Sequence, residues 1–173
     1  MAIKVRRWSR TDLARVRDLW LGTYRAGPVD DSGPLFPDAD ERLLRWLVEG
    51  ERQRAVVGYV ADDEEGRLAG FIVAHQARWE FDPPIRSGTR VVVVDAIAVE
   101  PRARRQGVGR LLADRLIEHA RISGAVSIEV DVESPDPAAA RFWASSGFHT
   151  RRQSARLVIN PREPESPDVS EGR

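Results

Sequence analysis

The chain has 173 residues, of which 42% are hydrophobic and 31% are charged, which is enough for one domain with a buried core and too little for two. Basic and acidic residues both number 27, so the zero net charge disfavours a general affinity for nucleic acid or an anionic membrane. The absence of cysteine excludes disulfides, thiolate metal sites and a cysteine nucleophile.

The first half of the chain alternates strand and helix patterns. In chain order it predicts a strand at residues 3–8, a helix after Thr11, a loop at 27–40, a helix from Asp40 to Gly50, and a hairpin of strands at 55–61 and 68–77. The polar N-terminus lacks an apolar signal run, and no segment approaches the roughly 18 apolar residues of a membrane span. A cytoplasmic protein without a membrane partner is expected.

The second half begins with the most apolar segment, VVVVDAIAV at residues 91–99, which predicts a central strand buried on both faces. The later elements are a helix closed by Gly124, a strand at 126–132, a short helix at 137–145 stopped by Gly147, and strands at 148–153 and 155–159. The fold class is therefore α/β of the α+β type, with a mixed sheet of about six to seven strands and about four helices. We expect one domain over 1–160 and a disordered tail at 161–173.

The loop after the central strand, RRQGVG at residues 104–109, leads directly into a helix. Free amides at a helix N-terminus favour an anion, and Gly107 and Gly109 permit close approach of the backbone to a diphosphate. A Walker loop needs Lys and then Ser or Thr after its second glycine, where Arg110 and Leu111 stand here. A dinucleotide fingerprint needs three glycines, and only two are present.

The same loop resembles the Q/R-x-x-G-x-G/A motif of GNAT N-acetyltransferases. The segment DPAAARFWASSGF at 136–148 is similar to the family's second acetyl-CoA segment, and Trp143 and Asp136 stand where that pattern has its Tyr and Asn. The resemblance implies the GNAT fold, acetyl-CoA as co-substrate and no metal. It also implies transfer to a primary amine of a small molecule or protein by direct attack in a ternary complex, with a homodimer as a family-level expectation.

The resemblance further implies where the coenzyme lies. Its diphosphate should meet the amides of residues 105–110, and its pantetheine arm should pair with the strand edge at 97–99. The expected cofactor-binding residues are Ile97, Ala98, Val99, Arg104, Arg105, Gln106, Gly107, Val108, Gly109, Arg110, Asp136 and Trp143. For each arginine of the loop, and for Arg102 before it, a solvated basic loop is the alternative to a phosphate ligand.

Three residues are candidates for the general base that acetyl transfer to an ammonium group requires. Asp95 interrupts the apolar central strand, where an unpaired charge is costly, so it should face a cleft or form an ion pair. Asp131 matches the place of a catalytic Glu in ribosomal-protein N-terminal acetyltransferases of the family. Glu129 and Glu133 alternate in phase with it, and a solvated strand face remains open for all three. His75 is the third candidate because an unperturbed imidazole titrates near neutrality, with a structural role as its alternative.

Trp143 is the main departure from the family pattern. Many GNAT enzymes use the Tyr at this place to protonate the departing thiolate, whereas an indole donates a hydrogen bond but no proton. Water, Ser145, Ser146 or Tyr24 could replace it. Two other hypotheses remain, a catalytically weak acyl-CoA-binding module and an arginine-rich nucleic-acid binder at residues 102–110. Substrate recognition is expected from residues 24–40, 80–89 and the late strands.

Overall fold

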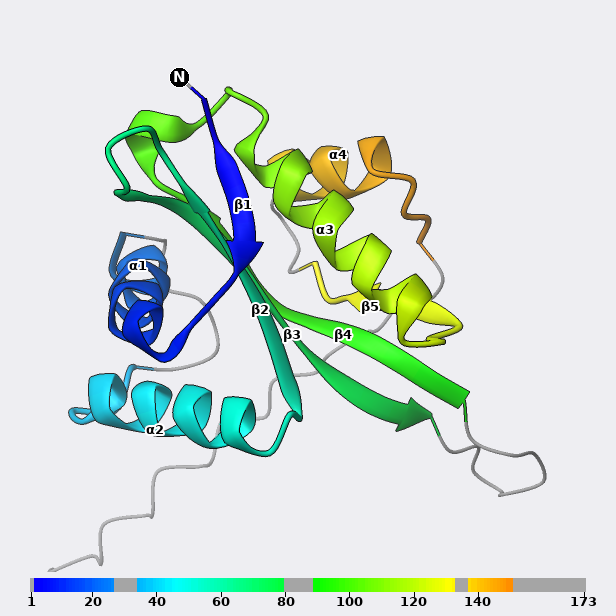
Figure 1. Cartoon of the computed structure of the whole chain (residues 1–173), viewed down its shortest axis with the longest axis horizontal. Coiled ribbons are helices and arrows are strands. Elements are labelled where there is room, and N and C mark those ends of the chain that lie inside the picture. The colour runs from blue at the N-terminus through cyan, green and yellow to red at the C-terminus, as the bar shows by residue number, and fades with distance from the viewer. Residues whose placement is uncertain (1, 27–33, 80–88, 133–136, 151–173) are drawn as a thin grey trace, which may run out of the picture.

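A computed structural model describes residues 2–26, 34–79, 89–132 and 137–150 (Figure 1). The elements are, in chain order, β1 Lys4–Arg7, the 3-10 turn η1 Arg10–Asp12, α1 Leu13–Ala26, α2 Ala39–Arg52, β2 Val56–Asp62, β3 Leu68–Trp79, β4 Thr89–Val99, the 3-10 turn η2 Pro101–Ala103, α3 Val108–Ile122, β5 Ser127–Val130 and α4 Pro137–Ser145. The sheet runs β1-β2-β3-β4-β5, antiparallel except for the parallel pair of β4 and β5.

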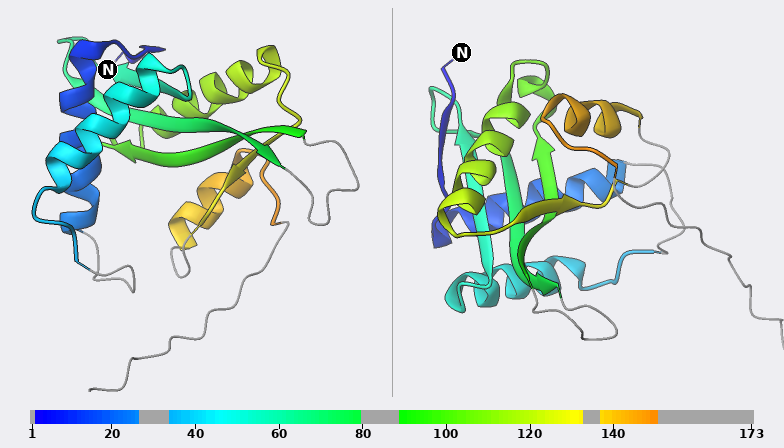
Figure 2. Two further views of the ribbon diagram at one scale, coloured as in Figure 1. Left: turned by 90° about the horizontal axis from the view of Figure 1, so that it is seen from below. Right: turned by 90° about the vertical axis from the view of Figure 1, so that its right-hand side faces the viewer.

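Helices cover both faces of this sheet (Figures 1 and 2). Along β3, Phe71 and Val73 pack in a core with α1 and α2, whereas Ile72 and Ala74 pack in a second core with α3 and α4. The alternation follows from the two-residue period of a strand. Because β3 and β4 are apolar on both sides, they form the rigid centre on which a site can be built.

The mixed α/β class is confirmed, with one difference in strand number. Five strands lie within the described residues, against about six to seven expected. Residues 148–150 are not in a strand, and the rest of the two expected late strands, at 151–159, falls outside the described residues. Every helix in the described ranges is too short or too polar to traverse a lipid bilayer.

The bounds of α2 differ from the prediction. The helix begins at Ala39, after Asp38, and continues through Gly50 to Arg52, so the expected cap at Asp40 and the expected stop at Gly50 were wrong. A Cβ at Gly50 would lie only 2.4 Å from Cγ2 of Val56. The glycine therefore permits close contact between α2 and the start of β2, a tertiary constraint that resembles a helix stop in the sequence.

A buried carboxylate, Asp12, joins β1 to the start of α1. Its side chain is 1% exposed, and the guanidinium of Arg6 donates to both of its oxygens, at 2.7 and 2.9 Å. Arg15 Nη2 donates to it at 2.5 Å, and the backbone N–H of Ser9 donates at 2.7 Å. The Arg6 hydrogen bond, followed by those of Ser9 and Arg15, outweighs burial and holds the pKa of Asp12 well below its usual range.

We expect Asp12→Asn to lower the free energy of unfolding by about 2 kcal/mol at pH 7, because it removes one partner of a buried ion pair. Because folding lowers the pKa of Asp12, its ion pairs stabilise the fold at pH values above the unfolded pKa of about 3.9. This stabilisation is lost as the pH falls below that value. Urea unfolding should therefore show wild type and variant converging in acid. Asp18→Asn, at an exposed ion pair with Arg17, should change stability by less than about 0.5 kcal/mol. A difference in unfolding free energy between wild type and Asp12→Asn that stays constant down to pH 3 would contradict this role of the Asp12 carboxylate.

Candidate active site

Strand β4 loses its pairing with the edge strand β5 near its middle. Pairing between β4 and β5 runs from Val91↔Ser127 to Val94↔Val130, whereas pairing between β4 and β3 continues to Val99. The backbone N–H of Glu100 donates to Ala69 at 2.9 Å, so by alternation the backbone groups of Ile97 and Val99 point away from β3. Within the described residues no strand pairs with this edge, which leaves it available to an extended ligand.

A β-bulge marks the point of separation. Val94 pairs with Ala74 and Ala96 pairs with Val73, so Asp95 is the extra residue of β4. Bulges redirect a side chain and interrupt pairing, and they occur often beside active sites. Asp95 is thus positioned by backbone irregularity at the first residue beyond the last β4–β5 pair.

Asp95 and His75 form a hydrogen-bonded pair. His75 Nδ1 lies 2.7 Å from Asp95 Oδ1, and the two side chains are 38% and 18% exposed. Burial raises the pKa of the Asp95 carboxyl, against the opposing hydrogen bond and charge of His75. The second oxygen, Oδ2, is buried and has no partner among the described residues. A carboxylate with a raised pKa and an unused oxygen is typical of a functional group rather than a structural ion pair.

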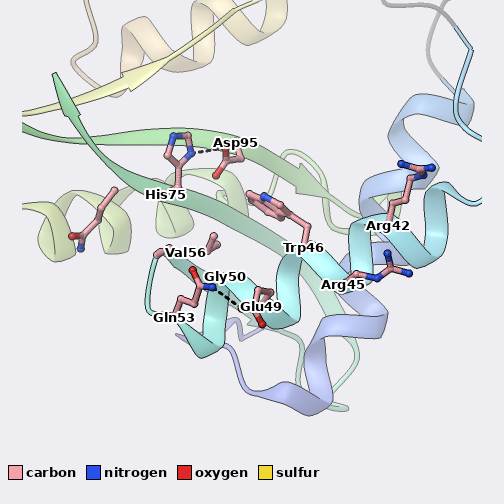
Figure 3. Close-up of a pocket in the computed structure, with 11 residues that line it drawn as sticks. Arg42, Arg45, Trp46, Glu49, Gly50, Gln53, Val56, His75 and Asp95 are labelled. Carbon is pink, nitrogen blue, oxygen red and sulfur yellow. Dashed lines mark hydrogen bonds and ion pairs between the residues drawn. The ribbon is translucent and has the colours of Figure 1, made fainter. Parts of the chain in front are cut away.

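The pair faces an open cleft of about 680 Å³ between α2 and the sheet (Figure 3). The cleft is lined by Arg42, Arg45, Trp46, Glu49, Gly50, Gln53, Ala55, Val56, His75, Gln76 and Asp95. Substrate recognition was expected from residues 24–40, 80–89 and the late strands, and residues 27–33, 80–88 and 151–159 lie outside the described part of the chain. Helix α2 supplies most of the described wall of the cleft. Arg42 and Arg45 were not expected there, because arginines on an amphipathic helix have the pattern of an ordinary solvated face.

The loop before α3 presents free backbone donors. Arg105 and Gly107 both have positive φ, at 61° and 80°, and α3 begins at Val108. The first N–H to bond back into the helix is that of Leu111, to the Gly107 carbonyl at 3.1 Å, so the amides of residues 108–110 have no intrahelical partner. A Cβ at Gly107 would meet no atom within 4 Å, which leaves the space in front of these amides open.

The arginines around this loop do not form a free basic patch. Arg102 donates to the buried Asp63 at 2.5 Å, Arg104 Nε donates to the Val99 carbonyl at 3.2 Å, and Arg110 donates to Asp114 at 2.9 Å and to the Ser145 carbonyl at 2.8 Å. Only Arg105 is exposed with no hydrogen bond or ion pair to the described residues. Arg102, expected either to bind phosphate or to lie in a solvated loop, instead ties the loop to the turn after β2 through its ion pair with Asp63.

Trp143 lies in the core beneath the loop. It is 5% exposed, with its ring centroid 4.9 Å from that of Phe142 and 4.8 Å from that of Phe148. A Cβ at Gly109 would lie 3.2 Å from the Phe142 ring, so this glycine also serves the packing of α4 against α3. The hydroxyls of Ser145 and Ser146 both donate to the Phe142 carbonyl. Their protons are therefore not free for transfer to a leaving group.

Asp131 follows β5 directly and is exposed. Because Val130 pairs with Val94, the parallel register places Asp131 level with Asp95, where the strands part. His75 and Asp95 are thus brought together, while Asp131, just after β5, makes no hydrogen bond or ion pair to either of them. Glu133 and Asp136 lie outside the described residues. Across the described ranges no three His, Asp or Glu side chains are arranged to hold a metal ion.

This arrangement agrees with the comparisons. The sequence profile of the Acetyltransferase (GNAT) family matches residues 13–148. The chain belongs to the GNAT acetyltransferase family. Among similar GNAT proteins, the L-methionine sulfoximine/L-methionine sulfone acetyltransferase of Salmonella typhimurium is 32% identical over 125 residues, covering 70% of this chain and 66% of that protein. The L-amino acid N-acyltransferase of Escherichia coli is 32% identical over 114 residues, covering 64% and 59%. The match thus spans somewhat less than two thirds of either relative.

Solved structures show the same GNAT fold. A protein from Bacillus halodurans aligns with a TM-score of 0.72 at 21% identity, covering 90% of this chain and 99% of its own. A predicted acetyltransferase from Clostridium acetobutylicum, solved with acetyl-CoA, aligns with a TM-score of 0.66 at 16% identity, covering 91% and 96%. These likenesses establish the fold of the chain.

Proposed function

We propose that this chain transfers the acetyl group of acetyl-CoA to a primary amine by direct attack in a ternary complex. The observation that carries the proposal is the His75–Asp95 pair, which faces a cleft at the bulge where β4 leaves β5. The activities that the two relatives are named for, acetylation of L-methionine sulfoximine or L-methionine sulfone and N-acylation of L-amino acids, support an amine acceptor.

The residues present fit the coenzyme. The free amides of 108–110, the glycine at 107 and the unpaired Arg105 suit a diphosphate, since a helix N-terminus and a guanidinium both favour negative charge. The unpaired backbone groups of Ile97 and the N–H of Val99 suit the amide groups of a pantetheine arm, by the pairing that extends a sheet, while the Val99 carbonyl accepts from Arg104. Such a ligand would end at the bulge, next to Asp95.

The pair at the bulge would handle the proton. With the Nδ1–H of His75 donating to Asp95, Nε2 is left as an acceptor, and the carboxylate stabilises the imidazolium that forms. The amine loses one proton to His75, its nitrogen bonds to the thioester carbon, and the carbon–sulfur bond breaks. General base catalysis by a positioned side chain contributes typically 10²–10⁴-fold to rate.

The leaving thiolate has no proton donor on α4. The Trp143 indole is buried in the core, and the serine hydroxyls after it donate to a backbone carbonyl. A thiol with an ordinary pKa of about 8.5 is a tolerable leaving group near neutrality, so its protonation can be left to water. Trp143 then packs in the core, and the presence of Trp where the family pattern has Tyr does not remove activity.

Two measurements test the proposal together. Calorimetry should show that the purified chain binds coenzyme A, and a thiol-release assay with acetyl-CoA should respond to at least one member of a primary-amine panel, with an acetylated product of matching mass. Tight coenzyme binding without turnover across the panel would favour the acyl-CoA-binding module. No heat with coenzyme A would overturn the proposal entirely.

A further inference from the structure

A buried carboxylate in the turn between β2 and β3 reaches across to η2, the short turn that precedes the loop at residues 104–107. Asp63 follows β2 directly, and its side chain is 0% exposed. Its Oδ1 accepts from the backbone N–H groups of Glu65 and Arg67, at 3.1 and 2.8 Å, so this oxygen orders the turn itself. Its Oδ2 accepts from two guanidinium groups, those of Arg67 at 2.9 Å and of Arg102 at 2.5 Å. Burial raises the pKa of the carboxyl, but these hydrogen bonds outweigh burial and hold the pKa well below its usual range, so the group is charged.

Arg102 joins η2 to both ends of this hairpin turn. Besides its bond to Asp63, its Nη2 donates at 2.9 Å to the carbonyl of Leu68, the first residue of β3. The turn between β2 and β3 and the segment that follows β4 accordingly lie side by side (Figure 1). The side-chain amide of Gln106 donates to the Arg102 carbonyl at 3.0 Å, so the loop also folds back onto this residue. The direction in which the chain leaves β4 for α3 therefore depends on the contacts of Arg102.

We infer that the Asp63–Arg102 ion pair positions the loop for the coenzyme diphosphate, which makes Arg102 a positioning residue and not a phosphate ligand. This rests on the proposed function and deepens it. The free amides of residues 108–110 bind an anion well only when they converge on it, and an ion pair formed before the ligand arrives lowers the conformational cost of binding. If Arg102 turned to a phosphate, the buried Asp63 would lose one of its two cations, which is costly.

Arg67 provides the matched comparison. It donates to the same oxygen of Asp63 as Arg102 does, but its hydrogen bonds and ion pairs to the described residues stay within the turn, at Asp63 and Glu65. Loss of either arginine removes one cation from the same buried carboxylate. Only loss of Arg102 releases η2, so the two variants separate an effect on the loop from an effect on the turn.

The test measures coenzyme A binding by calorimetry with the full chain. Arg102→Gln should weaken binding by about 10-fold, as for a loop that adopts its binding geometry only about a tenth of the time. Arg67→Gln should change binding by less than about 2-fold. Arg102→Lys, which keeps the charge beside Asp63, should bind within about 3-fold of wild type. With saturating acetyl-CoA, kcat of Arg102→Gln should stay within about 2-fold of wild type, because the His75–Asp95 pair is unchanged.

Asp63→Asn separates positioning from direct phosphate binding. Asn can still accept from the backbone of the turn, but it lacks the charge that holds Arg102. If Arg102 positions the loop, this variant should weaken coenzyme A binding by about 5- to 10-fold, and the double variant with Arg102→Gln should lose little more than either single variant. If Arg102 binds phosphate, its freed guanidinium would preserve or strengthen binding in Asp63→Asn, and that result overturns the inference.

The remaining outcomes also decide. Unchanged coenzyme binding in Arg102→Gln, or an equal loss in Arg67→Gln, overturns the inference while the proposed function stands. If wild type binds no coenzyme A, the proposed function fails, and amide hydrogen exchange of the hydrogen-bonded amides within residues 103–111 decides the positioning role. Faster exchange there in Arg102→Gln but not in Arg67→Gln supports that role, and equal exchange in the two variants overturns it.

Discussion

Replacing Asp95 by Asn should lower kcat by roughly 10²- to 10³-fold with the best amine, and leave the affinity for coenzyme A within about 3-fold. The amide of Asn can still accept from His75, but it carries no charge to stabilise the imidazolium. The effect should belong to the chemical step, because Asp95 faces the cleft, whereas the loop proposed to bind coenzyme A lies beyond the end of β4 and η2. Steady-state kinetics with acetyl-CoA in excess, together with calorimetry of coenzyme A, would measure both quantities.

His75→Gln is the partner variant in this experiment. If the two side chains act as one unit, the double variant should lose little more than either single variant, because interacting groups are not additive. In the proposed mechanism the unprotonated pair is the active form, so kcat/KM of wild type should fall as pH drops through the apparent pKa of the pair. A fully additive double variant that keeps this acid limb would exclude the pair as the base.

The sequence was informative about this pair for a physical reason. A carboxylate inside an apolar strand is costly, so Asp95 had to face a cleft or a partner, and the structure supplies both. The bulge that turns it toward His75 could not be predicted, because β4 is apolar on both faces and shows no change of alternation at that point. The pairing of residues twenty positions apart depends on strand register, which a single sequence does not specify.

Glycines were informative in a different way. Gly107 and Gly109 were correctly placed at the start of α3, and Gly124 and Gly147 at helix ends, since both of the latter have positive φ. Gly50 has the same appearance in the sequence but lies inside α2, where the missing side chain accommodates Val56. Local patterns predict backbone conformation, whereas contacts between distant elements become visible only in three dimensions.

The acceptor wall illustrates the same limit. Arg45 appears in the sequence as one of many charged residues on an amphipathic helix, and only the structure shows that Glu49, four residues later, bonds to Arg52 and Gln53 instead. The sequence pattern of a helix does not show which of two nearby basic residues an acidic side chain will bind. Arg102 shows the converse, since it stands in the basic stretch next to the coenzyme motif and yet is held by the buried carboxylate of Asp63.

Replacing Gly107 by Asp should weaken coenzyme A binding by about 30- to 150-fold, which corresponds to roughly 2–3 kcal/mol of repulsion between a carboxylate and a diphosphate several ångströms apart. The new side chain would point into space that holds no atom within 4 Å of its Cβ, so it should not disturb packing. Calorimetry at low and high salt would measure the loss. Because the repulsion is electrostatic and the loop is exposed, the loss should shrink as salt rises.

Gly107→Asn provides the matched control, since Asn has nearly the shape of Asp without its charge. Both residues tolerate the left-handed conformation at φ 80° better than other side chains do, so both variants should unfold at similar temperatures. The Asn variant should bind coenzyme A within about 5-fold of wild type. Equal losses in both variants would mean that glycine serves only the turn, and no loss in either would place the diphosphate elsewhere. Only a loss confined to Asp locates the negative charge of the coenzyme in front of the free amides of α3, and with it the thioester at the bulge that carries Asp95.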